Sequence, residues 1–206
     1  MQVEAVVFDI GNVLIGWQPE RYFDTRIGPA RRRALFDAVD LHGMMQRIDE
    51  GGVFGDVVEE TAMAYPDWSD EIRCFRDRWN DLAGPEIAHS VRLLRALRSK
   101  GMPCFALSNF GRENFPLSEV EFPFLTEFDR RYISGVMKLA KPNPAIYAEV
   151  ETDSGLHPGA LLFADDRRDN IEAAAARGWQ THLFTSPDCF AADLVARGLL
   201  GPDEAR

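Results

Sequence analysis

Short apolar runs alternate with amphipathic stretches along most of this 206-residue chain. Runs of about four to eight residues rich in Val, Ile, Leu and Phe are typical of buried strands. They occur at residues 3–8, 102–108, 131–135, 160–165 and 180–185. The pattern therefore predicts several short strands separated by long connections.

Between these runs, apolar residues recur at the spacing of amphipathic helices. Helices are predicted at 31–49, 53–65, 69–82, 85–101, 143–155, 169–178 and 188–198. Strands that alternate with helices predict an α/β fold, a doubly wound (Rossmann-like) parallel sheet. The helical stretch after the first strand predicts a small cap. We expect residues 1–15 and 85–206 to form the core and residues 16–84 the cap.

Polar side chains follow the predicted strands. Those at or near the strand ends are Asp9, Ser108, Asn109, Lys141, Asp165, Asp166, Asp169 and Asn170. In a parallel α/β sheet the carboxyl ends of the strands meet at one edge, where ligands bind. We therefore expect these side chains to gather around one site.

Such a set suits nucleophilic attack on a centre that carries negative charge. The carboxylate of Asp9 could attack phosphorus and form an aspartyl phosphate. Asp166 would help to hold a Mg²⁺ ion, the Ser108 hydroxyl would hold phosphoryl oxygens, and Lys141 would neutralise the remaining charge. Crowded carboxylates repel one another without a cation, so the acidic cluster itself predicts a metal.

The composition of the chain limits the classes of partner that we expect. The formal net charge of −10 disfavours nucleic acid and anionic membranes as partners. The three cysteines, Cys74, Cys104 and Cys189, form no CxxC pair and predict neither a disulfide framework nor a zinc site. No signal peptide or membrane span is visible in the sequence. We expect a cytoplasmic monomer or homodimer with a small phosphorylated substrate.

Four segments, VVFDIGNVL, FALSN, KLAKPNPAIY and LLFADDRRDNIEAA, resemble the four motifs of the haloacid dehalogenase-like (HAD) hydrolase superfamily, in order and in spacing. The resemblance spans residues 3–178. The residues of these motifs are most similar to those of the branch that includes α-D-glucose-1-phosphatase-like and 2-haloacid dehalogenase-like enzymes. The helical insert resembles the small helical cap of that superfamily.

The resemblance implies roles for individual residues. Asp9 would be nucleophile and metal ligand, and Gly11 would offer its backbone carbonyl to the metal. Asn109 would join Ser108 at the phosphoryl group. Asp166 would ligate Mg²⁺. Outside these ligands, Asp165, Asp169 and Asn170 would bind the ion through water or orient Lys141.

One position departs from the common phosphatase motif. Gly11 stands where many members carry a second Asp as general acid and base, a group worth roughly 10²–10⁴ in rate. The glucose-1-phosphatase-like branch also has glycine there. Because a sugar hemiacetal is a better leaving group than a simple alcohol, Gly11 favours an anomeric phosphate as substrate.

Other functions stay open. A 2-haloacid dehalogenase also lacks the second Asp and has a Ser-Asn pair, but its fourth motif is neutral where this chain is acidic. A catalytically inactive relative could bind a phosphorylated ligand. A receiver domain uses a similar residue set, but in another order along the chain and without a helical insert.

Three further residues are candidate substrate contacts. Asn12 could touch the ligand or support the tight turn after Asp9. Trp17 could line the pocket or pack at the hinge of the insert. Arg112, four residues after Ser108, could bind a second anionic group.

Overall fold

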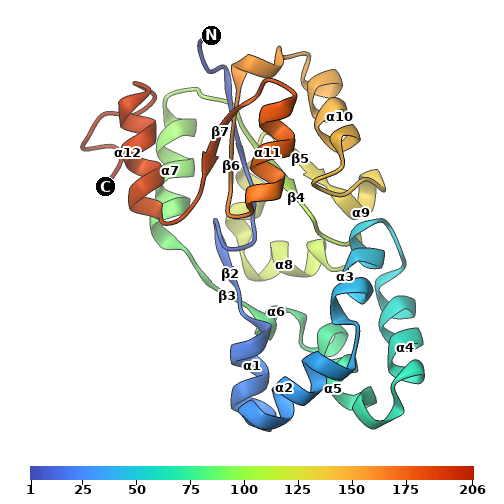
Figure 1. Cartoon of the computed structure of the whole chain (residues 1–206). Coiled ribbons are helices and arrows are strands. Elements are labelled where there is room, and N and C mark those ends of the chain that lie inside the picture. Colours follow the sequence, from blue (N-terminus) through green and yellow to red (C-terminus); the bar gives the residue numbers. More distant parts are fainter.

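The computed structural model describes residues 1–206 as a parallel sheet covered by helices, with a separate group of helices below it (Figure 1). The sheet has five strands in the order β5-β4-β1-β6-β7. They are β1 (Ala5–Phe8), β4 (Cys104–Ser108), β5 (Arg130–Ile133), β6 (Leu161–Asp165) and β7 (Gln180–Leu183), and every neighbouring pair is parallel. This confirms the predicted α/β fold class.

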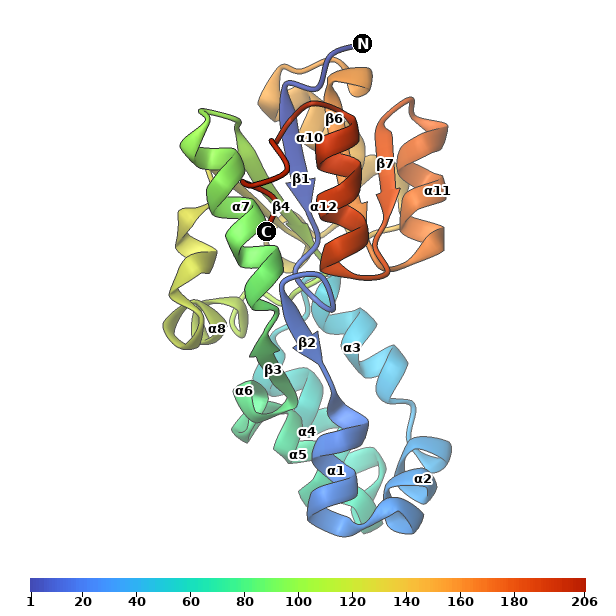
Figure 2. The ribbon, with the colours of Figure 1, turned by 90° about the vertical axis from the view of Figure 1, so that its left-hand side faces the viewer.

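Alternation along the strands divides the core into two layers. Val6 and Phe8 of β1 face one apolar cluster, and Ala5 and Val7 face another. The first cluster is covered by α7 (Ala88–Ser99) and α12 (Pro187–Ala196), which lie together in front of β1 in Figure 2. The second is covered by α10 (Pro144–Ser154) and α11 (Arg168–Ala176). A strand buried on both faces reads as a continuous apolar run, as residues 5–8 do.

Short elements complete the sheet unit. They are α8 (Phe115–Glu121), η2 (Pro123–Glu127), α9 (Ser134–Met137) and η3 (Pro158–Ala160). The sequence pattern did not predict α8, η2 or α9, because each is too short to show a helical period.

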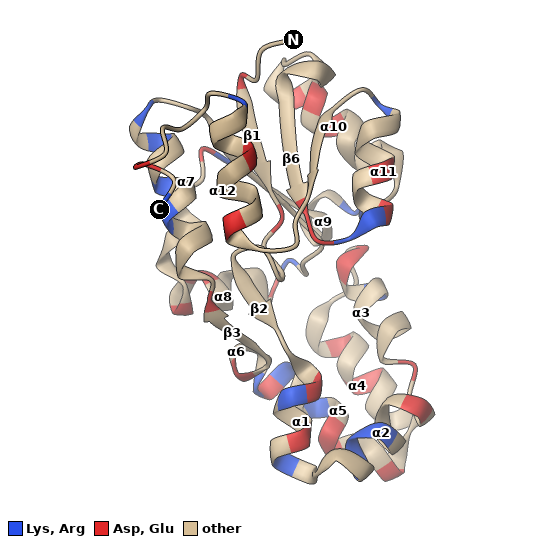
Figure 3. Ribbon diagram, turned by 60° about the vertical axis from the view of Figure 1, so that its left-hand side comes forward, with Lys and Arg blue, Asp and Glu red and all other residues tan.

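The remaining helices form a second group, the helical layer, which spans residues 19–82. It consists of α1 (Pro19–Ile27), α2 (Pro29–Ala38), α3 (Leu41–Asp49), α4 (Phe54–Ala64), η1 (Pro66–Trp68), α5 (Ser69–Asp77) and α6 (Trp79–Leu82). It has its own cluster of 14 buried apolar residues. Figure 3 shows Lys, Arg, Asp and Glu on most helices of both parts and in the loops between them.

A two-stranded antiparallel ribbon connects the two parts (Figure 2). It is formed by β2 (Ile15–Trp17) and β3 (Ala83–Glu86), where Ile15 pairs with Glu86 and Trp17 with Ala83. The prediction of a helix from Pro85 is therefore wrong at its start, because residues 83–86 are drawn into this ribbon. The pairing joins segments far apart in the sequence, which local periodicity does not reveal.

The predicted helix at 31–49 is also wrong as a single element. It breaks between α2 and α3, where Val39 has extended backbone angles. Asp40 then caps α3, accepting a hydrogen bond at Oδ1 from Gly43 N at 2.8 Å. An aspartate that satisfies free backbone N–H groups favours a new helix start over a continuous helix.

No helix has both the length and the apolar character needed to cross a membrane.

Candidate active site

Asp9 lies at the centre of the sheet edge, directly after the fully buried strand β1. Its backbone N–H bonds the carbonyl of Ala164 on β6, so it stands beside the end of that strand. β1 and β6 lie where the strand order reverses, the point at which open α/β sheets bind ligands. The Asp9 side chain is only 10% exposed.

One oxygen of Asp9 carries all of its protein contacts. Oδ1 accepts hydrogen bonds from Ile10 N at 2.7 Å and Ser108 Oγ at 2.8 Å, and pairs with Lys141 Nζ at 2.9 Å. These contacts fix the carboxylate and leave Oδ2 free. Burial raises the pKa of Asp9 to about 7, although Lys141 opposes the shift. A cation bound nearby would lower it again.

Lys141 bridges two carboxylates at the sheet edge. Its Nζ lies 2.6 Å from Asp165 Oδ2 as well as 2.9 Å from Asp9 Oδ1, and its side chain is 1% exposed. Burial alone would lower the pKa of Lys141, but the two carboxylates outweigh it and hold the pKa above its usual value. Lys141 is therefore a cation, which a buried anionic site requires.

Asn109 supports Lys141 through the backbone. Its Nδ2 donates to the Lys141 carbonyl at 2.9 Å, and its Oδ1 accepts from Lys141 N at 2.8 Å. Asn109 lines the cavity, as expected for a substrate contact. Both ends of its amide also tie the loop after β4 to the loop that carries Lys141.

An acidic cluster lies beside Lys141. Asp9, Asp165 and Asp166 each place one carboxylate oxygen within 4.8 Å of the others. Oxygens at this spacing suit a hard divalent cation such as Mg²⁺. Burial raises the pKa of Asp166, although its hydrogen bond from Asn12 and the charge of Lys141 oppose the shift. The donor set therefore fits a metal.

Asp165 is already engaged by the protein. It pairs with Lys141 and accepts from Arg167 N at 2.8 Å and from Asn170 Nδ2 at 3.0 Å. Asp169 instead pairs with Arg167 on the first turn of α11, and its side chain is 46% exposed. Asp9 and Asp166 thus keep the free oxygens, while Asp165 and Asn170 stand behind them and Asp169 lies outside the cavity.

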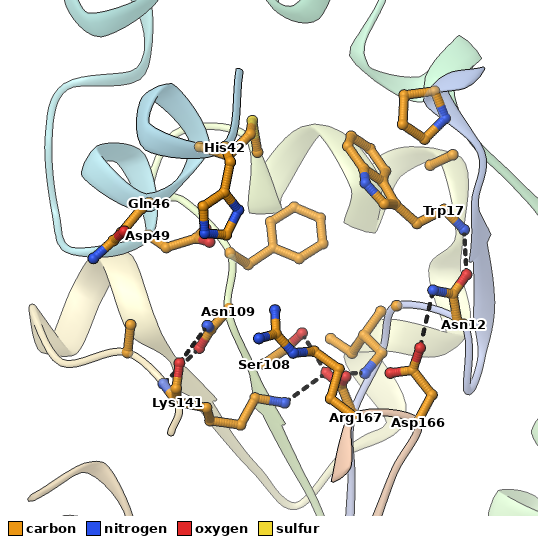
Figure 4. A pocket seen from close by; sticks show the side chains of 18 of the residues that line it. Asn12, Trp17, His42, Gln46, Asp49, Ser108, Asn109, Lys141, Asp166 and Arg167 are labelled. Atoms are coloured by element: carbon orange, nitrogen blue, oxygen red, sulfur yellow. Dashed lines mark hydrogen bonds and ion pairs between the residues drawn. The ribbon is translucent and has the colours of Figure 1, made fainter. Parts of the chain in front are cut away.

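The turn after Asp9 depends on Asn12. Its backbone is left-handed, with φ of 56°, a conformation that Asn tolerates better than most residues. Its Nδ2 donates to Asp166 Oδ2 at 3.1 Å, and its Oδ1 accepts from Trp17 N at 2.9 Å. Figure 4 shows this chain of contacts from β2 to the acidic cluster. Asn12 therefore shapes the turn and also orients Asp166.

Trp17 both lines the cavity and packs at the junction of the two parts. Its ring lies 5.0 Å from that of Trp79, measured between ring centres.

Arg112, the third candidate substrate contact, is placed differently. It pairs with Glu113 at 2.8 Å, its side chain is 58% exposed, and it does not line the cavity. Arg167 is the arginine in the cavity wall.

The cavity between the sheet edge and the helical layer has a volume of about 780 Å³. Its upper wall in Figure 4 is formed largely by α3, with His42, Gln46 and Asp49 labelled there. With Met45 these residues follow the spacing i, i+3, i+4, i+7, which places them on one helix face. The sequence did not predict His42, Gln46 or Asp49 as cavity residues, because no motif marks them. The helical spacing was the available signal.

Comparison with known proteins agrees with this architecture. No family model matches the chain. It is 23% identical over 195 residues to a D-ribitol-5-phosphate phosphatase of Bacteroides thetaiotaomicron, covering 87% of this chain and 90% of that protein. It is 24% identical over 200 residues to the sesquiterpene phosphatase astK of Aspergillus oryzae, covering 96% and 97%.

Solved structures share the fold. A HAD family enzyme from Bacteroides thetaiotaomicron matches with a TM-score of 0.70 and 24% identity, over 90% of this chain and 95% of that chain. Its complex with magnesium and inorganic phosphate matches with a TM-score of 0.67 and 23% identity, over 89% and 95%. The L-2-haloacid dehalogenase of Xanthobacter autotrophicus with covalently bound chloropropionic acid matches with a TM-score of 0.64 and 18% identity, over 98% and 86%. The fold and these relatives agree with the resemblance of the four sequence motifs to the HAD-like hydrolase superfamily.

Proposed function

We propose that this protein is a Mg²⁺-dependent phosphatase that hydrolyses a small phosphorylated metabolite, such as a sugar phosphate, through an aspartyl phosphate. The observation that carries the proposal is the acidic cluster of Asp9, Asp165 and Asp166 beside the buried cation of Lys141. A dehalogenase needs no metal, whereas a phosphatase must offset the charge of its substrate. The matched phosphatases and the neighbour solved with magnesium and phosphate support the same choice.

In the proposed reaction, the free Oδ2 of Asp9 attacks phosphorus while Oδ1 stays anchored by Ser108 and Lys141. The bond from phosphorus to the leaving oxygen breaks, and the phosphoryl group is transferred to Asp9. Ser108 and Lys141 stand beside the nucleophile, within reach of the phosphoryl oxygens that gain charge. Water then hydrolyses the aspartyl phosphate and releases inorganic phosphate.

Asp9, Asp166 and the backbone carbonyl of Gly11 would hold the Mg²⁺ ion, with Asp165 and Asn170 behind them. When bound, Mg²⁺ screens the repulsion between the carboxylate nucleophile and the anionic substrate. Asn12 keeps Asp166 in position through its 3.1 Å hydrogen bond.

We assign residues 16–84 as a cap that covers the cavity and opens to exchange ligands. The ribbon of β2 and β3 is its connection to the core residues 1–15 and 85–206. Closure of such a cap excludes water from the phosphoryl group and brings its own side chains to the substrate. Substrate selectivity would therefore depend on cap residues such as those of α3.

A 2-haloacid dehalogenase is the second candidate. It is favoured by the Ser108-Asn109 pair, by Gly11 and by the structural likeness to the Xanthobacter enzyme. In that reaction Asp9 would form an ester with the substrate carbon as halide departs. The acidic cluster, which such an enzyme does not need, argues against it.

The purified protein should be tested with p-nitrophenyl phosphate, α-glucose 1-phosphate and L-2-chloropropionate, each with Mg²⁺ and with EDTA. Release of phosphate that EDTA abolishes is the expected result. Release of chloride in EDTA would establish the dehalogenase instead. Absence of turnover on all three would favour an inactive relative that binds a phosphorylated ligand.

A further inference from the structure

The proposed phosphatase lacks a proton donor at Gly11. A Cβ atom built there meets no atom within 4 Å, so the position next to the nucleophile is open space. Ser108 and Lys141 are both committed to Asp9. An alkoxide is a poor leaving group unless it receives a proton as it departs. The reaction therefore needs an acid from another residue.

The other acidic and imidazole groups in the cavity wall differ in their contacts. Asp40 accepts from Gly43 N as a helix cap, and Asp166 accepts from Asn12. His42 and Glu50 are exposed. Asp49 is different, because its Oδ1 is shielded from solvent and has no hydrogen-bond partner.

Asp49 is the last residue of α3 and lines the cavity. In Figure 4 it lies beside His42 and Gln46 on the α3 wall, facing the loops that carry Asn109 and Lys141. An unpartnered buried oxygen is costly, about 1–3 kcal/mol, unless a ligand supplies the missing contact. The side chain is therefore placed to meet a substrate from the α3 wall of the cavity.

The electrostatic setting also suits an acid. Burial raises the pKa of Asp49 to about 7, with Asp9 and Glu50 adding to the shift and Lys141 and Arg167 opposing it. His42 is the remaining titratable group beside it in Figure 4. A carboxyl group with this pKa can both donate and accept a proton near neutral pH.

We propose that Asp49, supplied by the helical layer, is the general acid and base of this phosphatase in place of a side chain at Gly11. When the bond from phosphorus to the leaving oxygen breaks, the carboxylic acid of Asp49 gives its proton to that oxygen, and the alcohol departs. The Asp49 carboxylate then takes a proton from the water that attacks the aspartyl phosphate, which restores the acid. The inference rests on the proposed phosphatase function.

The proposal changes the expected substrate. From the sequence, Gly11 favours an anomeric phosphate, whose leaving group depends less on protonation. With Asp49 as donor, ordinary alkyl phosphates are substrates as well. The chemistry then requires the helical layer to be closed on the sheet edge, since the nucleophile and the acid come from different parts of the chain.

The test uses aryl phosphates of similar shape and different leaving-group basicity, from p-nitrophenyl to phenyl to p-methoxyphenyl phosphate, with Mg²⁺ present. Asp49→Asn should lower kcat/KM for phenyl phosphate by about 10²-fold. For p-nitrophenyl phosphate, whose leaving group departs without a proton, the loss of kcat/KM should be smaller by a factor of about ten or more. Loss of activity should therefore grow with leaving-group basicity. The alkaline decline of kcat above about pH 7 on phenyl phosphate should disappear in the variant.

Asp56→Asn is the matched control, because Asp56 is an exposed carboxylate on α4 that does not line the cavity. It should keep the wild-type dependence on the leaving group. The double variant Asp49→Asn with Gly11→Asp returns a carboxyl group to the sheet edge, and recovery of phenyl phosphate turnover would support the donor role.

An equal loss by Asp49→Asn on every aryl phosphate would overturn the role of Asp49 and leave the phosphatase intact. A wild-type protein that hydrolyses none of the esters would overturn both proposals.

Discussion

The sheet edge and the α3 wall face each other across one cavity and are built differently. At the sheet edge, Asp9, Ser108, Lys141 and Asp165 are all buried, and each has a polar partner in the protein. On the α3 wall, Asp49 has a buried oxygen without a partner. Groups that satisfy one another are held rigidly, while an unsatisfied group is available to a ligand.

The two parts also differ in what holds them together. The sheet unit rests on two large apolar clusters, one on each face of the sheet. The helical layer has one cluster of 14 buried residues. It meets the sheet unit through the β2–β3 ribbon, the contacts of Trp79, and hydrogen bonds from Phe54 N to Glu113 Oε2 and from Asn80 Nδ2 to the Leu117 carbonyl. A unit with its own apolar core can move relative to its neighbour, as the proposed cap function requires.

The largest expected effect comes from Asp9→Asn, which tests the role of the sheet edge. We expect loss of phosphate release by about 10⁴-fold or more, because the amide is no nucleophile. The melting temperature should not fall, since burial works against the charged form of Asp9. Phosphate assays and thermal melts monitored by circular dichroism check both points. A variant that keeps its turnover would show that Asp9 is not the nucleophile.

Trp79→Ala tests the junction between the two parts. The Trp79 ring packs against Trp17, Phe54 and Phe110, and its Nε1 donates to Ser118 Oγ at 3.0 Å. Removing such a buried aromatic should lower the free energy of unfolding by about 3–5 kcal/mol. Hydrogen exchange should show the loss of protection in the helical layer first. Uniform loss of protection in both parts would mean that they unfold as one unit.

Asn12→Gly tests the connection from the ribbon to the acidic cluster. Glycine adopts the left-handed backbone at no cost, so the change removes only the contacts to Asp166 and Trp17. Loss of such a supporting contact should weaken Mg²⁺ binding by about 10- to 100-fold, measured by calorimetric titration.

Lys138→Gly is the matched control for Asn12→Gly, because Lys138 also has a positive φ and lies outside the cavity wall. It should leave Mg²⁺ affinity at the wild-type value. Equal affinity in the wild type and Asn12→Gly would show that Asp166 needs no support from the turn.

The smallest expected effect comes from Glu151→Gln, far from the cavity. Glu151 accepts from Arg177 Nη2 at 2.6 Å and from Trp179 Nε1 at 2.7 Å, and these contacts hold its pKa below the usual value. A lowered pKa adds stability above the pKa of the unfolded chain, and this stability is lost as the pH falls through the folded value.

The free energy of unfolding in Glu151→Gln should therefore be lower by about 1 kcal/mol at pH 7. Urea titrations should show this difference shrinking as the pH falls below about 4. A difference that stays constant with pH would mean that the charge of Glu151 contributes nothing to it.

The sequence by itself determined the sheet and its edge. Apolar runs such as residues 5–8 and 161–164 are buried on both faces, so their pattern depends on the core and is visible locally. Asp9, Ser108 and Asp165 follow or end these strands, and parallel pairing brings strand ends together. Their gathering at one site could therefore be predicted before any contact was known.

Only the tertiary structure decided what faces that edge. The β2–β3 ribbon, the break between α2 and α3 and the placement of Arg112 outside the cavity depend on contacts between segments distant in sequence. The α3 wall likewise depends on contacts between segments distant in sequence. Nothing next to Asp49 in the chain distinguishes it from any other aspartate on a helix. What sets it apart is a shielded carboxylate oxygen without a partner in the cavity wall, close enough for the charge of Lys141 to act on it, and such a setting exists only when the chain has folded.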